Sequence, residues 1–109
     1  VNLHGTGTIA NDVPEGRAVS AVFGTQTPCS STKGWTGHTL GAAGIVEAAL
    51  SMLCIEQDFL PRSLNTRTKD PAIEAAILLD SRTAAVCYVM SNSFGFGGNN
   101  CSLLFGRIS

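Results

Sequence analysis

The sequence predicts a single α/β domain, in which a mixed sheet carries packed helices and one helix is fully buried. Segments with strand and helix character follow one another in the order strand, helix, strand, helix and then two or three strands. The second helical segment is apolar on almost every side, and the last segment alternates with a period of two. A chain of 109 residues is long enough for one domain and too short for two.

The chain opens with a strand end and a glycine-rich loop. Residues 1–3 are short and apolar, and they lead into the sequence HGTGT at positions 4–8, whose glycines and threonines favour an irregular loop. Residues 27–31 form the next predicted strand, and residues 32–37 form the loop that leaves it.

Between these strands, residues 12–23 are predicted to form a helix. Asn11 or Asp12 can cap its N-terminus, and Pro14 fits its first turn. Glu15 suits the positive end of the helix dipole.

The second helix is predicted over residues 38–57, a run that is apolar almost all round and therefore typical of a helix buried on every side. Residues 41–44 are all glycine or alanine, which would let another backbone approach closely. A long polar connection over residues 61–71 follows this helix.

The last third of the chain is predicted to be mostly strand. Residues 77–79 and 84–90 are strand candidates, and residues 93–99 form a glycine-rich turn. Residues 101–106 alternate in the way that suits a final strand.

The composition favours a buried position within something larger. Hydrophobic residues make up 44% of the chain and charged residues only 14%. A net charge of −1 provides no attraction to nucleic acid or to anionic lipid, so neither is expected as a partner. The apolar stretch of about residues 40–55 contains Glu47 and is shorter than the roughly 20 residues that cross a bilayer, so no membrane span is expected.

The cysteines and the start of the chain indicate a piece of a cytoplasmic protein. The cysteines are widely spaced, without the paired spacing or histidine cluster of a zinc site, so we expect reduced, mostly buried thiols and no metal: Cys29, Cys54, Cys87 and Cys101. The opening Val-Asn-Leu-His has no initiator methionine and no signal-peptide pattern.

The two histidines, His4 and His38, lie beside glycines in a loop or at a helix start, where chemistry is usually done. His38 is expected at the N-terminus of the second helix, whose dipole would keep the imidazole neutral. A neutral imidazole can donate a hydrogen bond to a developing enolate or oxyanion. A structural role for each histidine is the alternative.

Lys33 and Glu47 are predicted to form an ion pair, because Glu47 is the only acid in an otherwise apolar helix and a buried, unpaired carboxylate is costly. The alternative is that Glu47 reaches solvent. Gly95, Phe96 and Gly97 belong to a segment that lacks the spacing of a dinucleotide loop. It could present backbone N–H groups to a ligand, or it could be a plain hairpin turn.

Three motifs resemble the C-terminal motifs of β-ketoacyl-acyl-carrier-protein synthases: HGTGT at 4–8, SSTKGWTGHTLGAAG at 30–44 with Glu47 after it, and SNSFGFGGNN at 91–100. The resemblance implies a thiolase-like fold of which residues 1–109 form the C-terminal part. The N-terminal half, which bears the nucleophilic cysteine in this family, would be absent, and the fragment alone would be inactive.

The resemblance also implies a reaction and partners. Such enzymes perform a decarboxylative Claisen condensation of an acyl thioester with malonyl-acyl-carrier protein in fatty-acid or polyketide-type biosynthesis. No cofactor is implied beyond the phosphopantetheine of acyl carrier protein. The partners would be acyl carrier protein, the N-terminal half and, for the full-length protein, a second copy in a homodimer.

By the same resemblance, His4, His38, Lys33, Glu47 and Phe96 are the candidate catalytic residues, with Phe96 as a gate whose N–H completes an oxyanion hole. The candidate substrate-binding residues are Thr6, Thr8, Gly95 and Gly97. Asn99 departs from the threonine of many members. Asn11, Asp12 and Glu15 agree with the family's usual N-D-x-x-E pattern.

Two other functions remain open at this point. One is a catalytically silent partner, such as the chain-length subunits of condensing synthases. The other is a cysteine hydrolase that uses Cys29 and one histidine.

Overall fold

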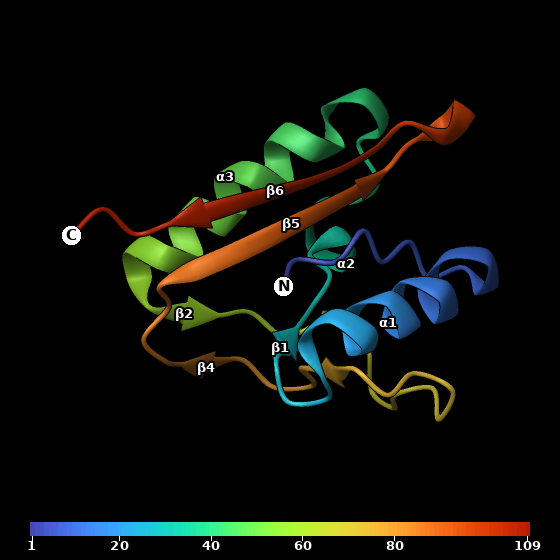
Figure 1. The fold of residues 1–109 in the computed structure, drawn as a ribbon, viewed down its shortest axis with the longest axis horizontal. Helices are drawn as coiled ribbons and strands as arrows, with labels where there is room; N and C mark the ends of the chain where they lie inside the picture. The colour runs from blue at the N-terminus through green and yellow to red at the C-terminus, as the bar shows by residue number, and fades with distance from the viewer.

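The structure is a computed structural model that describes residues 1–109, and a mixed sheet runs through its centre (Figure 1). Strands β1 (Pro28–Cys29) and β3 (Ala76–Ile77) pair in parallel, and β5 (Tyr88–Phe94) pairs with β6 (Asn100–Gly106) in antiparallel. Asn2 lies between the two pairs and bridges in parallel to both Ser30 and Ser91. The order across the sheet is therefore β3, β1, the opening segment, β5 and β6.

The helices α1 (Ile9–Phe23) and α3 (Ala43–Gln57) cover opposite faces of this sheet. Successive side chains of an extended segment point to opposite faces. Asn2 donates its side-chain N–H to the backbone oxygen of Glu47 in α3 (3.3 Å), whereas Leu3 packs with Val19 of α1. The opening residues therefore separate two helical layers.

Helix α1 begins at Ile9, earlier than the predicted residue 12, and Thr8 precedes it as the N-cap. The predicted caps were wrong, because the backbone N–H groups of Asn11 and Asp12 already bond to the oxygen of Thr8. The Asp12 carboxylate instead accepts from the N–H of Gly7 at 3.3 Å. Pro14 consequently lies in the second turn and not in the first.

The approach to α3 also differs from the prediction. Lys33–Thr36 forms a short helical turn, α2, where a loop was expected. A 3₁₀ turn, η1 (Leu40–Ala42), then precedes α3, so His38 lies ahead of the helix and not at its N-terminus. Gly37 (φ 74°) and Leu40 (φ 52°) adopt left-handed backbone conformations, which an α-helix cannot include.

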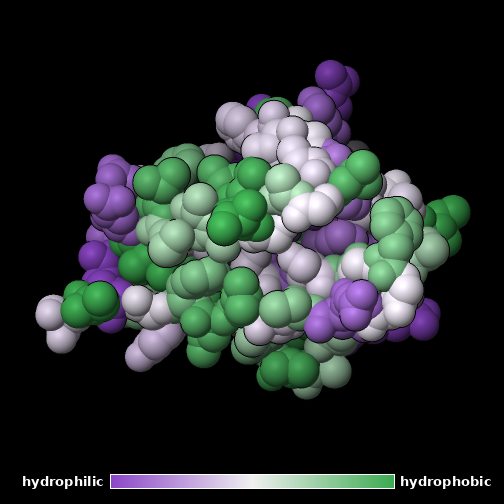
Figure 2. Space-filling model, turned by 90° about the horizontal axis from the view of Figure 1, so that it is seen from above, coloured by the Kyte–Doolittle hydropathy of each residue, from purple (hydrophilic) through white to green (hydrophobic).

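Helix α3 is buried on one side only, so the prediction of a helix buried all round was wrong for this chain. Glu47, Ala48, Ser51 and Ile55 are among its buried residues, on the side toward β5, while Ile45 is 75% exposed. Figure 2 shows apolar side chains gathered over the face that carries α3 and β6. The physical reason is that a single sheet packs against the helix.

The stretch Leu40–Gln57 is long and apolar enough to cross a membrane by length and composition, with a mean hydropathy of 1.3 over 18 residues. The sequence argument judged this stretch too short, but 18 residues fall within the range of known spans. Core helices of soluble proteins pass the same test, so one such helix is weak evidence for a span.

The C-terminal third confirms the last strand and shifts the others. β3 covers Ala76–Ile77 where residues 77–79 were predicted, and the strand expected at 84–90 is β5, which begins at Tyr88. Asp58 explains the second shift, because it accepts the N–H groups of Ala84 and Val86 and so holds this segment outside the sheet. The short pair β2 (Phe59–Leu60) and β4 (Arg82–Thr83) was not predicted.

All four cysteines are free thiols, as predicted, but they are not mostly buried. Only Cys29, in the central strand β1, is buried. Cys101 is exposed because β6 is an edge strand, and Cys87 is exposed just before β5.

Candidate active site

The two histidines meet at one end of the sheet. The ring centroids of His4 and His38 lie 5.6 Å apart with the rings nearly perpendicular, at 89°. Phe94, at the end of β5, packs edge-on against His4 at 5.5 Å. His4 is 7% exposed, whereas His38 is exposed, so one imidazole is held within the protein and the other faces outward.

Lys33 connects His4 to α3. Its ammonium forms an ion pair with Glu47 and lies 3.4 Å from Nδ1 of His4. Glu47 is 1% exposed and Lys33 is 9% exposed, so the ion pair is buried and the alternative of a solvent-exposed Glu47 is wrong. The pair confirms the argument from the cost of a lone buried carboxylate.

These contacts fix which nitrogen of each ring carries the proton in the neutral form. A lysine ammonium can only donate, so His4 accepts through Nδ1 and keeps its hydrogen on Nε2. His38 accepts the backbone N–H of Leu40 through Nδ1 at 3.2 Å, which leaves its hydrogen on Nε2 as well. Each neutral ring therefore offers Nε2–H as a hydrogen-bond donor.

The pKa of His4 is lowered from its ordinary value of 6.5, first because burial disfavours the charged ring and next because the Lys33 charge repels a second cation. The neutral imidazole is therefore the prevailing form of His4 near pH 7. This form suits a donor that keeps its proton during a reaction.

Glu15 holds the loop that carries His4, a role that the sequence analysis missed. Its carboxylate accepts the backbone N–H groups of His4 (2.8 Å) and Gly5 (2.9 Å), and also the side-chain amides of Asn11 and Asn92. Glu15 is 4% exposed. The available clue was its position one helical turn before Val19, on the apolar side of α1.

The histidines open onto a hollow of about 320 Å³. Phe96 stands at its rim and is 87% exposed, and Gly95 also lines it, whereas Gly97 does not. The N–H of Gly95 closes the turn by bonding to the oxygen of Asn99 at 2.7 Å. The segment is thus a hairpin turn between β5 and β6 that also borders the histidine hollow.

The two predicted substrate threonines lie together beyond His4. The hydroxyls of Thr6 and Thr8 are hydrogen-bonded to each other at 2.8 Å. Thr6 lines a second hollow, of about 510 Å³, together with Lys33 and His38, whereas Thr8 does not. His38 borders both hollows, so it stands where they adjoin.

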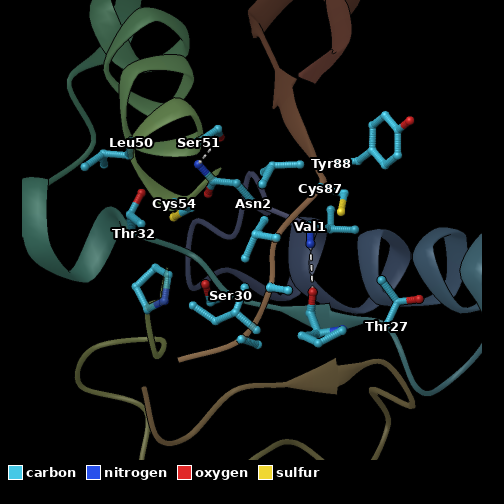
Figure 3. A pocket seen from close by; sticks show the side chains of 17 residues that line it. Val1, Asn2, Thr27, Ser30, Thr32, Leu50, Ser51, Cys54, Cys87 and Tyr88 are labelled. Carbon is cyan, nitrogen blue, oxygen red and sulfur yellow. Dashed lines mark hydrogen bonds between the residues drawn. The ribbon is translucent and has the colours of Figure 1, made fainter. Parts of the chain in front are cut away.

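A further hollow, of about 240 Å³, lies between the sheet, the second half of α3 and the chain before β5 (Figure 3). No Asp, Glu, His, Lys or Arg side chain lines it. Burial raises the pKa of the Cys54 thiol on its wall, which makes that thiol a poor nucleophile at neutral pH. This hollow therefore lacks the acid–base groups that the histidine site has.

Cys29 is not placed for nucleophilic catalysis. It is 1% exposed and packs with Leu3, Val19 and Ala75. Burial raises the pKa of its thiol, and its Sγ bonds to the oxygen of Thr27. The hypothesis of a cysteine hydrolase that uses Cys29 therefore has no support in the geometry.

Comparison with known proteins identifies the chain's family. The family model described as "Beta-ketoacyl synthase, C-terminal domain" matches residues 1–67, more than half of the chain. The chain belongs to the β-ketoacyl synthase family.

Relatives of this β-ketoacyl synthase chain support the same conclusion. The 3-oxoacyl-[acyl-carrier-protein] synthase 1 of Haemophilus influenzae is 46% identical over 110 residues, which cover 98% of this chain and 27% of that protein. A crystal structure of a β-ketoacyl synthase from Burkholderia phymatum matches 99% of the chain and 27% of its own, with a TM-score of 0.93 and 41% identity. A ketosynthase from Xenorhabdus doucetiae, solved with its chain length factor, matches 98% of the chain and 28% of its own, with a TM-score of 0.90 and 49% identity.

These matches confirm the thiolase-like fold predicted for the β-ketoacyl synthase chain. The chain spans about a quarter of the length of the relatives that it matches.

Proposed function

We propose that this chain is the C-terminal part of a 3-oxoacyl-acyl-carrier-protein synthase and supplies the two hydrogen-bond donors of its condensation site. The observation that carries the proposal is the perpendicular pair His4 and His38, 5.6 Å apart, with Lys33 against His4. Both rings present Nε2–H, and the pKa of His4 is lowered so that the ring stays neutral. The name of the Haemophilus relative states the same reaction for that protein.

The reaction needs donors because negative charge develops on the substrate oxygen. Loss of carbon dioxide from a malonyl thioester breaks a carbon–carbon bond and moves its electron pair into an enolate. Two N–H donors aimed at the enolate oxygen stabilise it, and each such donor is worth about 3 kcal/mol in comparable sites. The enolate carbon then attacks the acyl thioester, and the thiolate that carried the acyl group leaves.

Lys33 and Glu47 would serve this site without touching the enolate. The ammonium fixes the orientation of His4, and the buried carboxylate fixes the ammonium on α3. Phe96, exposed at the rim of the hollow, would act as the gate, and its backbone N–H would complete an oxyanion hole. Thr6 and Thr8 would hydrogen-bond the phosphopantetheine arm, and Gly95 and Gly97 would bind the substrate. No cofactor beyond that phosphopantetheine is proposed.

The nucleophile would come from outside this chain, from the N-terminal half of the same protein. The partners proposed are that half, acyl carrier protein and a second copy of the full-length protein, all in the cytoplasm. Helix α3 offers the N-terminal half an exposed apolar side. The 109 residues alone would therefore be inactive.

The test is a malonyl-carrier-protein decarboxylation and condensation assay on the full-length parent. His4→Ala and His38→Ala should each lower the rate by about a hundredfold or more, the loss expected on removing one oxyanion donor. An exposed-residue variant outside α3, Asp80→Ala, is the matched control and should keep the parent rate. Parent rates in both histidine variants would contradict the proposal.

A catalytically silent partner subunit is the second candidate, since a ketosynthase solved with its chain length factor is 49% identical to this chain. A silent subunit has no need for two oriented donors with a lysine behind them. The presence of His4, His38 and Lys33 in one cluster therefore favours the active enzyme.

A further inference from the structure

Ser31 links the two loops that carry the candidate catalytic residues. Its hydroxyl donates to the backbone oxygen of Gly5 at 2.9 Å and accepts the N–H of Lys33 at 3.4 Å. A Cβ added at Gly5 would lie 2.5 Å from Cβ of Ser31, so the loops touch at this point. One side chain therefore sets the spacing between the HGTGT loop and the turn of Lys33.

Ser63 in turn holds Ser31 from a distant part of the chain. The Ser63 hydroxyl accepts the backbone N–H of Ser31 at 3.1 Å, across 32 residues of sequence. The N–H of Ser63 bonds to the oxygen of Leu78 at 2.9 Å, and the residue is 6% exposed. The backbone of Ser63 is thus fixed by its bond to Leu78, independently of the contact between its hydroxyl and Ser31.

Two backbone contacts press the same connecting segment onto α2. A Cβ at Gly34 would lie 2.6 Å from the backbone oxygen of Leu64, so this position tolerates only glycine without a shift of one of the two backbones. The indole N–H of Trp35 donates to the backbone oxygen of Arg62 at 3.3 Å. Residues 62–64 therefore form a support beneath the turn that begins with Lys33.

We propose that Ser63 and Ser31 are positioning residues of the condensation site, which hold Lys33 against His4 through hydrogen bonds that run from Ser63 to Ser31 and on to Gly5 and Lys33. This inference rests on the proposed function. Neither serine acts on the reacting atoms, and both act through the imidazole of His4. Small displacements of groups behind a reacting centre lower rates by up to about a hundredfold, so the support matters to turnover.

The experiment compares three variants of the full-length parent by malonyl-carrier-protein decarboxylation across pH. Ser63→Ala should lower kcat about tenfold while KM changes by less than about twofold, because orientation and not binding is lost. The acid limb of its pH–rate profile should shift to higher pH. A Lys33 ammonium held less firmly against His4 lowers the pKa of that ring by less. Ser63→Thr, which keeps the hydroxyl, should restore most of kcat.

Ser91→Ala is the matched control. Ser91 is buried to a similar degree, at 3% exposure, but its hydroxyl has no hydrogen-bond partner. It should therefore keep both the kcat and the acid limb of the parent. If Ser63→Ala does not fold, Ser31→Ala removes the next link and is read in the same way.

The proposal is overturned if Ser63→Ala or Ser31→Ala keeps the parent kcat and acid limb and only melts at a lower temperature. A titration of His4 by ¹⁵N-histidine NMR separates this failure from failure of the proposed function. If the parent itself has no decarboxylase activity, the proposed function fails. In that case, a His4 pKa in Ser63→Ala equal to that of the parent overturns the positioning role of Ser63, and a higher His4 pKa supports it.

Discussion

The Glu15 carboxylate accepts the backbone N–H of His4 at 2.8 Å, so the loop that carries the His4 ring is hydrogen-bonded to the first turns of α1. A second carboxylate oxygen takes the N–H of Gly5 at 2.9 Å. Because both donors are backbone groups, the loop keeps this attachment whatever side chains it carries. The position of His4 therefore depends on a residue eleven positions away.

Replacement of Glu15 should weaken both the fold and the site. Glu15→Ala leaves the N–H groups of His4 and Gly5 without acceptors, and unsatisfied buried donors cost about 1–3 kcal/mol each. We expect the free energy of unfolding of the full-length parent to fall by about 3 kcal/mol, measured by urea denaturation followed by circular dichroism. Asp80→Ala, an exposed change outside α3, should leave it within about 0.5 kcal/mol. Equal stability of the two variants would show that the Glu15 contacts carry no weight.

The Lys33–Glu47 pair should be costly to break and cheap to replace. Lys33→Met leaves a carboxylate at 1% exposure without its partner, and losses of about 3–5 kcal/mol are typical of such changes. The double variant Lys33→Met with Glu47→Leu should recover most of this stability, because two apolar side chains replace two desolvated charges. Activity should stay low in the double variant, since His4 has lost its neighbour. A double variant no more stable than Lys33→Met would count against this account.

The lowered pKa of His4 predicts a pH dependence of stability. As pH falls below 6.5, the unfolded chain binds a proton at this histidine before the folded protein does, so stability is lost as pH falls from 6.5 through the folded pKa. At higher pH the ring is neutral in both states and the effect vanishes. Between about pH 7.5 and about pH 5.5, the parent should therefore lose more unfolding free energy than His4→Gln does. Parallel pH curves for the two proteins would mean that the His4 pKa is not lowered.

Cys29 should resist alkylation in the native protein. Its thiol is buried and its pKa is raised by burial, so the reagent cannot reach the sulfur and little of the thiol is ionised. Peptide mapping after iodoacetamide treatment should find Cys29 unmodified until denaturant is added. Rapid native labelling of Cys29 would revive the cysteine hydrolase hypothesis.

The sequence was informative where a single energetic rule decides the outcome. The period of two located β6, and the cost of a lone buried charge predicted the Lys33–Glu47 pair. The start of α3 was misplaced because left-handed backbone at Leu40, a residue that rarely adopts it, leaves no trace in the sequence. Glu15 was missed because its partners are backbone N–H groups, which every loop residue possesses.

The meeting of the two histidines could not be derived from spacing. It depends on the opening segment lying between β1 and β5, which brings His4 to the same end of the sheet as His38, in the chain after α2. The resemblance of the three motifs to the family suggested that His4 and His38 lie together, and the order of strands in the sheet explains why they do. All-round burial of α3 was predicted from composition, which cannot tell whether the second covering layer belongs to this chain.

The central place of Asn2 has a consequence for how fast this fold assembles. Asn2 must pair with Ser91, near the other end of the chain, before β1 and β5 belong to one sheet. The entropy of closing so long a loop is lost before most of the sheet contacts can form, and folds dominated by such distant pairings form slowly. The half-sheets β1–β3 and β5–β6 can each form from nearer residues, so they would wait for the first three residues to join them.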